Sequence, residues 1–324
     1  ESGSTLRFML PVAAAIGAET EFIRRNHLKE RPLSPLYEVL CENGAEISPQ
    51  KEEPLWLKGK IKGGSYQIDG SVSSQYISGL LMALPLLGEK CTLEITGKIE
   101  SEPYIRLTLQ MMEIFGVHPS YENRTFYFDG VTRYQAPEEI TVEGDWSQAA
   151  FFYGLNALGS QVEVTGLRSD SLQGDRVCER LLKEMTGGFL QADLSDCPDL
   201  APVLFAVAAG LGNGAHFTGT RRLAIKESNR ASAMGEELAK FGAEISVGEN
   251  EVKIAPVPLH RPKEILQGHN DHRVVMALAV LATRFGGVID DAQAISKSYP
   301  EFFRDLAGLG VQVRTEEDQE GETA

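Results

Sequence analysis

Three short loops of this sequence carry clustered basic side chains, namely Lys29-Glu30-Arg31-Pro32, Lys226-Glu227-Ser228-Asn229-Arg230 and Lys297-Ser298-Tyr299-Pro300. Lysine and arginine bind phosphate and carboxylate groups, and the planar fork of arginine matches two oxygens at once. A lysine next to a glutamate in a dry site forms a coupled pair that can exchange protons. A single surface Lys-Glu pair is usually solvated and without function. Three basic loops in comparable settings favour a site for small anions.

Five polar clusters stand directly before apolar runs of helical length: Ser2-Gly3-Ser4-Thr5, Ser73-Ser74-Gln75, Asp145-Trp146-Ser147, Asp196-Cys197-Pro198-Asp199 and Asn270-Asp271-His272-Arg273. Serine, aspartate and asparagine cap the free N–H groups of a helix start, and capping alone explains any one cluster. If several of these helix starts lie on one face of a domain, their N–H groups and positive dipole ends also form an anion site.

The elements that must position these residues follow an internal repeat. The first helix of each of five segments ends at Gly17, Gly88, Gly159, Gly212 or Gly286, and the second at Gly44, Gly116, Gly187, Gly242 or Gly310. The first series is spaced by 71, 71, 53 and 74 residues, which suits a βαβαββ unit rather than a solenoid repeat. The short interval predicts that the third copy lacks a strand pair around Met185–Cys197. We therefore expect an α/β protein with domains at residues 1–146 (two units) and 147–314 (three units), and a disordered acidic tail at 315–324.

Composition limits the function further. The chain has 324 residues, a formal net charge of -15 and four scattered cysteines without metal-like spacing to the six histidines. An acidic chain of this kind argues against nucleic acid as a partner, and no apolar run is long enough to span a membrane. The unpaired cysteine pattern favours a cytoplasmic protein. We expect no metal and no cofactor, and a monomer. Since the first residues contain no Met and open on a helix cap, we also expect a chain that begins partway through its fold.

These motifs resemble the signature segments of the 5-enolpyruvylshikimate-3-phosphate synthase family. The resemblance is carried, in the same order along the chain, by Gly3-Ser4-Thr5-Leu6-Arg7, Lys29-Glu30-Arg31-Pro32, Ser73-Ser74-Gln75-Tyr76 with Leu80-Leu81-Met82, Glu143-Gly144-Asp145, Lys226–Arg230, Asn270–Arg273 and Lys297–Pro300. It runs from Ser2 to about Leu309. It implies two domains of three βαβαββ units each, so that five of six units are present and the first is missing.

The resemblance also implies the reaction, in which the enolpyruvyl group of phosphoenolpyruvate moves to the 5-hydroxyl of shikimate 3-phosphate and phosphate is released. Asp199 resembles the base for that hydroxyl. Glu227 resembles the carboxyl group that exchanges a proton with the methylene carbon, and Lys226 the cation that contacts both substrates. His272 would orient Glu227, or it is a plain cap residue.

The binding residues follow from the same matches. Shikimate 3-phosphate would contact Ser73, Ser74, Gln75, Ser101, Tyr104, Asp199 and Lys226, although Tyr104 equally suits a packing role. Phosphoenolpyruvate would contact Gly3, Arg31, Gln75, Arg230, Arg273 and Lys297. Because Gly3 has no side chain, phosphoenolpyruvate or the inhibitor glyphosate could approach the backbone closely there. Domain closure around these ligands would expel water.

Two departures from the family pattern and three alternative functions stay open. The family's first unit contributes a Lys-Ser…Arg motif to both substrates, and without it we expect weak or no activity from this chain; the shortened third copy is the second departure. One alternative is transfer to UDP-N-acetylglucosamine, for which the loop Arg24–Arg31 lacks the reactive cysteine of that family. The others are an RNA 3′-phosphate cyclase relative, against which the acidic charge argues, and a binding fragment without catalysis.

Overall fold

The computed structural model describes residues 2–314, and the chain divides into two compact units. Unit 1 contains the chain up to Glu143 together with residues 168–174, and unit 2 contains residues 144–167 and the chain from Asp175 on. The boundary thus falls three residues before the predicted one, because Asp145 caps the first helix of unit 2 and packs with it. The predicted tail at 315–324 lies outside the described residues.

Unit 1 is built from helices on two sheets. Its helices are α1 (Gly3–Ile16), α2 (Leu36–Glu42), α3 (Ser74–Ala83) and α4 (Glu102–Ile114), with 3₁₀ helices η1 (Asn26–Lys29) and η2 (Leu84–Leu87). Its strands are β1 (Thr20–Phe22), β2 (Glu46–Ile47), β3 (Leu55–Lys58), β4 (Gly64–Asp69), β5 (Cys91–Thr96), β6 (Ser120–Glu122) and β7 (Thr125–Phe128). The first three form the antiparallel order β1-β3-β2. The others form β4-β5-β7-β6, in which only β4 and β5 are parallel.

Unit 2 contains a four-stranded sheet with the same arrangement as the sheet β4-β5-β7-β6 of unit 1. Its helices are α5 (Trp146–Ala157), α6 (Cys178–Thr186), α7 (Ala201–Leu211), α8 (Arg230–Lys240), α9 (His272–Phe285) and α10 (Phe302–Gly308). Its strands β8 (Leu190–Asp193), β9 (Ala215–Thr218), β10 (Ile245–Val247) and β11 (Glu251–Ile254) form the sheet β8-β9-β11-β10, again with one parallel pair, β8 and β9. Shorter 3₁₀ helices are η3 (Gly174–Val177), η4 (Pro198–Leu200), η5 (Arg221–Ile225) and η6 (Ala292–Lys297).

The helices end where the glycine pattern predicts. Gly17, Gly88 and Gly212 are C-caps with φ between 71° and 74°, a left-handed conformation that glycine adopts without a side-chain clash. The helices therefore begin and end at the same places in successive copies. This regularity gives equivalent starts to α1 and α3 in unit 1, and to α5, α7 and α9 in unit 2.

The strands follow the repeat less completely. The third copy passes from α6 directly to β8, so the strand pair predicted to be missing near Met185–Cys197 is absent from the described residues. The repeat also predicted strands after α5 and α9, and here it is wrong for residues 2–314. The stretch after α5 forms no strand, and the stretch after α9 forms an isolated bridge between Leu266 and Ile289. A strand requires a hydrogen-bonded neighbour along several residues. Within residues 2–314, the stretch after α5 is not paired as a strand, and the stretch after α9 pairs only at the bridge to Leu266.

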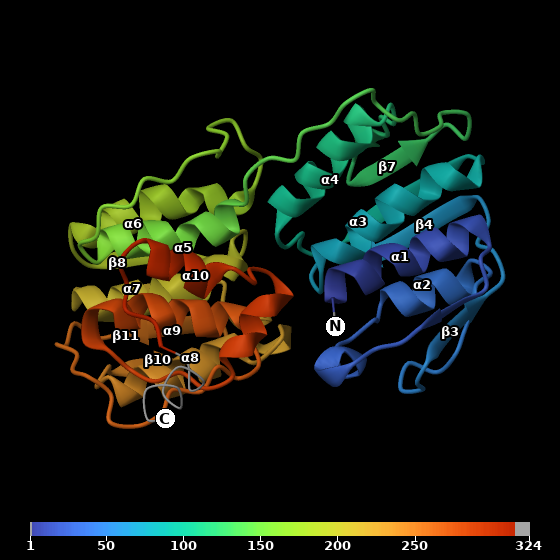
Figure 1. Cartoon of the computed structure of the whole chain (residues 1–324). Coiled ribbons are helices and arrows are strands. Elements are labelled where there is room, and N and C mark those ends of the chain that lie inside the picture. Colours follow the sequence, from blue (N-terminus) through green and yellow to red (C-terminus); the bar gives the residue numbers. More distant parts are fainter. Residues whose placement is uncertain (1, 315–324) are drawn as a thin grey trace, which may run out of the picture. The chain divides into compact units, whose positions relative to one another are not determined.

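The core of unit 2 is centred on α7, whose residues 201–210 are all buried. A helix that is apolar on every side must be enclosed, and α7 packs against α9, α5 and α8 (Figure 1). In unit 1, α1 and α3 run side by side over their sheets (Figure 1). Within residues 2–314, no helix combines the length and the apolar character needed to cross a membrane.

Candidate functional site

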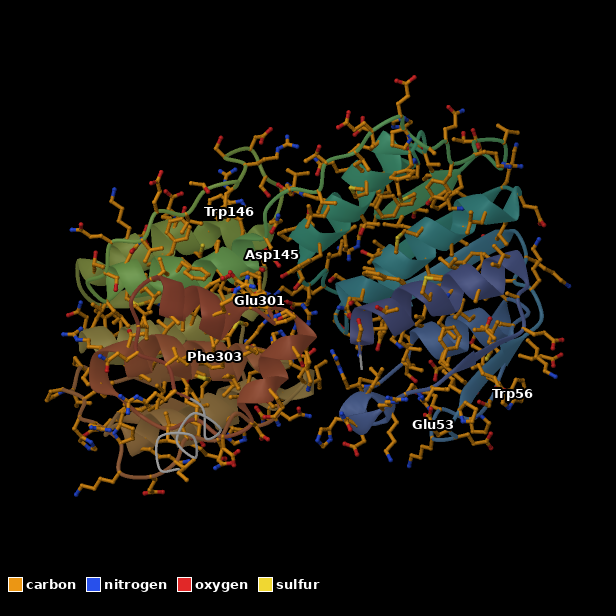
Figure 2. The ribbon with its side chains drawn as sticks, viewed as in Figure 1. Glu53, Trp56, Asp145, Trp146, Glu301 and Phe303 are labelled. Atoms are coloured by element: carbon orange, nitrogen blue, oxygen red, sulfur yellow. The ribbon has the colours of Figure 1, made fainter. Side chains whose placement is uncertain are left out.

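Three helix starts meet in unit 2, and Arg273 links them. Asp145 caps α5 by accepting from the backbone N–H of Ser147 at 2.8 Å, and Asp271 caps α9 by accepting from that of Arg273 at 2.9 Å. Figure 2 shows Asp145 and Trp146 at the start of α5. The Arg273 guanidinium donates to Ser147 Oγ at 2.5 Å and lies 3.2 Å from Asp199 in η4, directly before α7. The convergence of helix starts predicted from the repeat is therefore confirmed within unit 2.

Asp199 lies among three cations. Its carboxylate is 2.8 Å from Arg230 Nη1, 3.2 Å from Lys226 Nζ and 3.2 Å from Arg273 Nη2. Burial by itself raises the pKa of Asp199, but the three positive charges outweigh burial and hold the pKa well below its usual range. The sequence-predicted residues Asp199, Lys226, Arg230 and Arg273 thus form one ionic cluster.

Arg230 is the most enclosed member of this cluster, with a side chain that is 2% exposed. Its Nε donates to Asp271 at 2.8 Å, its Nη1 to Asp199 at 2.8 Å and its Nη2 to Glu227 at 2.6 Å. Burial lowers the pKa of Arg230, yet the surrounding carboxylates Asp271, Glu227 and Asp199 raise it overall. Arg230 therefore carries a permanent charge that holds three carboxylates in place.

Lys226 and Glu227 follow η5 and precede α8, whose N-cap is Asn229. Burial lowers the pKa of Lys226, and the nearby Arg230 and Arg222 lower it too, while Asp199 raises it. A lysine with a lowered pKa gives up its proton more readily at neutral pH. Lys226 and Glu227 are consecutive in the chain but form ion pairs with different partners, Lys226 with Asp199 and Glu227 with Arg230.

His272 is buried at the first turn of α9. Burial, and after it the charge of Arg273, lowers its pKa to about 4, so the ring is neutral at pH 7. Its Nδ1 makes no hydrogen bond within the described part of the chain and lies 4.0 Å from Asp271 Oδ1. The orienting role predicted for His272 stays a prediction, since the hydrogen bond shown to Glu227 comes from Arg230.

Lys297 is placed by the segment before α9. Its ammonium donates to the backbone oxygen of Asn270 at 2.6 Å and to Asn270 Oδ1 at 2.9 Å. Asn270 adjoins the cap residue Asp271, so Lys297 lies next to the residues that hold Arg230. The sequence-predicted phosphoenolpyruvate residues of unit 2 therefore gather at one helix start.

The predicted residues of unit 1 gather at the starts of α3 and α1. Ser73 caps α3, and Ser73 and Ser74 are both buried. Gln75 Oε1 accepts from Arg7 Nη1 at 2.7 Å, which ties the first turn of α3 to α1. The start of α3 thus presents hydroxyl and amide groups beside a buried guanidinium.

Ser101 and Tyr104 lie at the start of α4. Ser101 is buried and has φ 54°, a left-handed conformation unusual for a residue other than glycine. Such a conformation persists only where the surroundings enforce it, and it is frequent at binding sites. Thr108 of α4 donates to Ser78 of α3 at 2.7 Å, so these two helices pack together.

Gly3 and Arg31 are in direct contact. A Cβ added to Gly3 would lie 2.6 Å from Nη1 and 2.9 Å from Cζ of Arg31, closer than any side-chain carbon can approach. The absence of a side chain at Gly3 lets the Arg31 guanidinium lie against the first turn of α1. Two residues that were separately predicted to contact phosphoenolpyruvate therefore lie against each other in unit 1.

Sequence reasoning missed several residues that hold the site. Arg7 is 4% exposed, contacts Gln75 and the Pro32 carbonyl, and lies over the Tyr76 ring. Asp271 is fully buried and was interpreted only as a cap. Arg24, also buried, binds Glu53 at 3.0 Å at the base of the loop that carries Arg31. For Arg7, a signal was available, because it is a lone charge at the start of an otherwise apolar helix.

Comparison with known proteins decides the family. The profile of the family described as EPSP synthase (3-phosphoshikimate 1-carboxyvinyltransferase) matches residues 1–193 and 188–306. A 3-phosphoshikimate 1-carboxyvinyltransferase of Clostridium kluyveri is 38% identical over 97% of this chain and 78% of its own length, and one of Clostridium perfringens is 38% identical over 96% and 78%. The chain belongs to the EPSP synthase family. Its predicted membership is therefore confirmed.

Solved structures support the fold. An EPSP synthase from Acinetobacter baumannii has a TM-score of 0.74 at 20% identity, and covers 97% of this chain and 78% of its own. The enolpyruvyl transferase NikO from Streptomyces tendae has a TM-score of 0.68 at 15% identity over 95% and 76%. The predicted α/β enolpyruvyl transferase fold is thus confirmed, and the family match favours EPSP synthase over the alternatives considered from the sequence.

Proposed function

We propose that this protein is a 3-phosphoshikimate 1-carboxyvinyltransferase that moves the enolpyruvyl group of phosphoenolpyruvate to the 5-hydroxyl of shikimate 3-phosphate and releases phosphate. Family membership and 38% identity to enzymes of that name support this activity. The product leads to chorismate and the aromatic amino acids. The observation that carries the site assignment is the ionic cluster in which Arg230 links Asp199 to Glu227.

The reaction requires two proton movements, and the cluster offers a group for each. In the addition step, the 5-hydroxyl oxygen bonds to C2 of phosphoenolpyruvate, its proton passes to Asp199, and the methylene carbon takes a proton from the carboxyl group of Glu227. In the elimination step, the methyl carbon returns a proton to Glu227 while the bond from C2 to the phosphate oxygen breaks, and the proton held by Asp199 leaves with the released phosphate. Asp199 and Glu227 bind the same guanidinium, which fixes the spacing of the two proton-transfer groups.

The basicity of Asp199 depends on where the cations lie. With Arg273, Lys226 and Arg230 all facing its carboxylate, its pKa is held far below neutrality, and a carboxylate of this kind is a weak base. Phosphate and carboxylate groups of the substrates compete for the same cations. We infer that substrate binding draws these cations away from Asp199 and raises its pKa toward the value that a base requires.

Anion binding is divided among the remaining predicted residues. Arg31, Arg230, Arg273 and Lys297 would bind phosphoenolpyruvate, together with Gln75 and the close approach at Gly3. Ser73, Ser74, Gln75, Ser101 and Tyr104 would bind shikimate 3-phosphate, with Asp199 and Lys226. The buried hydroxyls of Ser73, Ser74 and Ser101 support this assignment, since hydroxyl and helix N–H groups suit phosphate oxygens.

We propose in addition that the protein acts as a monomer on these small molecules, without nucleic acid, in the cytoplasm. The four cysteines Cys41, Cys91, Cys178 and Cys197 are all unpaired, which suits a reducing compartment. Light scattering on a size-exclusion column tests the monomer, because a dimer would double the mass.

The activity is tested by incubating the full chain with both substrates and following phosphate release and the enolpyruvyl product by mass spectrometry. The proposal predicts that both products form, even at the weak rate expected from the sequence analysis, and that both are lost when either substrate is omitted. Asp199→Asn should lower kcat by on the order of 10²-fold or more while shikimate 3-phosphate still binds by calorimetry. A wild-type-like kcat in Asp199→Asn would refute the role of this carboxylate.

A further inference from the structure

Glu237 is a buried carboxylate in α8 that the proposed chemistry does not use. Its side chain is 2% exposed, and both of its oxygens are occupied. Oε2 accepts from Lys240 Nζ at 2.8 Å and from the backbone N–H of Gln267 at 2.7 Å. Oε1 accepts from Lys240 at 3.0 Å and lies 3.1 Å from His269 Nε2. One carboxylate thus holds α8 to the segment that leads into α9.

A metal ion is a poor explanation of this cluster. Ligand atoms of Glu236, Glu237 and His269 do lie within 4.8 Å of one another. The Lys240 ammonium, however, already contacts both oxygens of Glu237 and also the Ile265 carbonyl at 3.0 Å. A divalent cation would have to displace that ammonium. The cluster therefore has a structural role. We call Glu237 and the three residues bound to it, Lys240, Gln267 and His269, the clamp.

The clamped segment contains an unusual turn. His269 and Asn270 are consecutive residues with φ of 51° and 50°, a left-handed conformation that costs energy in residues other than glycine. Glu237 binds the first of them and the backbone two residues earlier. The second, Asn270, holds the Lys297 ammonium through its backbone and side-chain oxygens. The strained turn therefore presents two oxygens that hold the Lys297 ammonium.

Helix α8 grips this segment at two points. Glu237 stands seven residues after Arg230, two helical turns along the same face, and both side chains are almost fully buried. Arg230 binds Asp271, the residue directly after the turn. The turn at residues 269–270 is thus held between Glu237 on one side and Arg230 on the other.

We propose that Glu237 is a positioning residue for phosphoenolpyruvate binding, acting through the His269–Asn270 turn on Lys297. This inference rests on the proposed function, which gives Lys297 a role in binding phosphoenolpyruvate. Glu237 touches no substrate in this account. It keeps a strained turn in the one conformation that presents Lys297.

The test compares Glu237→Gln with Glu236→Gln, the same change at the neighbouring exposed position. The glutamine at 237 keeps the volume but loses the charge and one acceptor. We expect the KM for phosphoenolpyruvate to rise about tenfold, the effect of one charge-assisted hydrogen bond, with the KM for shikimate 3-phosphate and kcat within about twofold of wild type. A fall in kcat alone, or an equal rise in both KM values, would indicate a merely structural role and overturn the proposal.

Lys297→Met and the double variant Glu237→Gln/Lys297→Met test whether the effect of Glu237 passes through Lys297. If Glu237 acts through Lys297, the double variant should bind phosphoenolpyruvate no more weakly than Lys297→Met does; additive losses would contradict the proposal. An unchanged KM in Lys297→Met would refute the assigned role of Lys297, and this inference with it. An altered Lys297→Met beside a wild-type-like Glu237→Gln would overturn the inference alone.

A measurement without substrates covers the case in which Glu237→Gln is too unstable for kinetics. His269→Ala removes one contact of the clamp and leaves Lys240 and Gln267 in place. In hydrogen exchange of the ligand-free protein, peptides covering residues 265–271 should exchange at least several-fold faster in His269→Ala, while β9 and β11 remain protected. Unchanged exchange of this segment would show that the clamp does not hold the turn.

Discussion

The helices of unit 1 and unit 2 start with the same kind of cap. The side chains around those helix starts, however, differ in their chemistry. At the start of α3, Ser73, Ser74 and Gln75 present neutral groups, with the Arg7 guanidinium beside them. At the start of α9, Asp271 and Arg273 belong to a cluster of paired charges. Neutral hydroxyl and N–H groups hold a phosphate without moving protons, whereas paired ionisable groups can exchange them. We infer that unit 1 chiefly binds and that unit 2 carries the proton transfers.

The largest effect is expected from removing Arg230, the cation at the centre of the unit 2 cluster. Arg230→Met leaves Asp199, Asp271 and Glu227 without their shared partner in a buried setting. Breaking a buried ion pair costs about 3–5 kcal/mol, and we expect a loss of that size in urea unfolding, together with loss of activity. Arg106→Met, at an exposed pair with Glu102 in unit 1, is the control and should cost under about 1 kcal/mol. Similar losses in the two variants would show that the cluster is not special.

The second test separates binding from proton transfer. Glu227→Gln keeps the shape of the side chain and a hydrogen-bond acceptor for Arg230 but removes its exchangeable carboxyl proton. We expect kcat to fall on the order of 10²–10⁴-fold, with the KM for shikimate 3-phosphate little changed. In unit 1, Ser74→Ala should show the reverse pattern, a raised KM for shikimate 3-phosphate with kcat nearly retained. A Ser74→Ala variant with the larger loss of kcat would invert the division of labour.

The third test uses pH, to which unit 2 should respond through His272. Its pKa is about 4 in the folded protein, against 6.5 for the unperturbed side chain, so the unfolded chain binds the additional proton as the pH falls below 6.5. Stability therefore decreases between pH 6.5 and pH 4, by about 3 kcal/mol from this group. The lowered pKa values of Asp199 and Asp271 act only below their ordinary value of 3.8, outside this window.

The measurement is urea unfolding of the wild type and of His272→Asn at pH 7 and pH 4.5. The variant should lose markedly less stability on acidification than the wild type. Equal losses would mean that His272 does not become protonated on unfolding, and that another group causes any acid sensitivity.

What the sequence could predict depends on how local the cause is. Glycines such as Gly17 and Gly212 end their helices through their own backbone freedom, so their role was visible in the pattern alone. The contact between Arg273 and Ser147 joins residues 126 positions apart, and that between Arg230 and Asp271 joins residues 41 apart. No local pattern specifies such pairs, because they arise when separate helices pack. Asp271 was therefore predicted as a cap and missed as a partner of Arg230.

The same limit applies to strands. The repeat predicted strands after α5 and α9, but a strand forms only where a neighbouring segment pairs with it along several residues. Motifs that matched a family as a whole, such as Lys226–Arg230, named candidate residues without their contacts. The candidates were thus proposed from the sequence, while their arrangement around Asp199 required the packed structure.

A fourth test probes the close contact in unit 1. In Gly3→Ala the new Cβ would fall 2.6 Å from the Arg31 guanidinium, so Arg31 must move. Arg31 is a flexible side chain, and we expect the fold to remain intact while the KM for phosphoenolpyruvate rises about tenfold, or roughly 1.4 kcal/mol. If Gly3→Ala leaves this KM unchanged, Arg31 does not contact that substrate from its present position.

The smallest effect concerns the feature that the two units share. Ser73 caps α3 by accepting from Gln75 at 3.3 Å, and Asp145 caps α5 by accepting from Ser147 at 2.8 Å. Replacing either residue with alanine should cost about 1 kcal/mol of unfolding free energy, in unit 1 as in unit 2, because a cap acts on the helix start whatever chemistry surrounds it. Ser73→Ala should in addition weaken shikimate 3-phosphate binding in calorimetry, since the same hydroxyl is proposed to bind the phosphate. Asp145→Ala should not. If both variants lose stability equally and neither loses affinity, Ser73 is a cap alone, and the binding assigned to unit 1 must come from its other side chains.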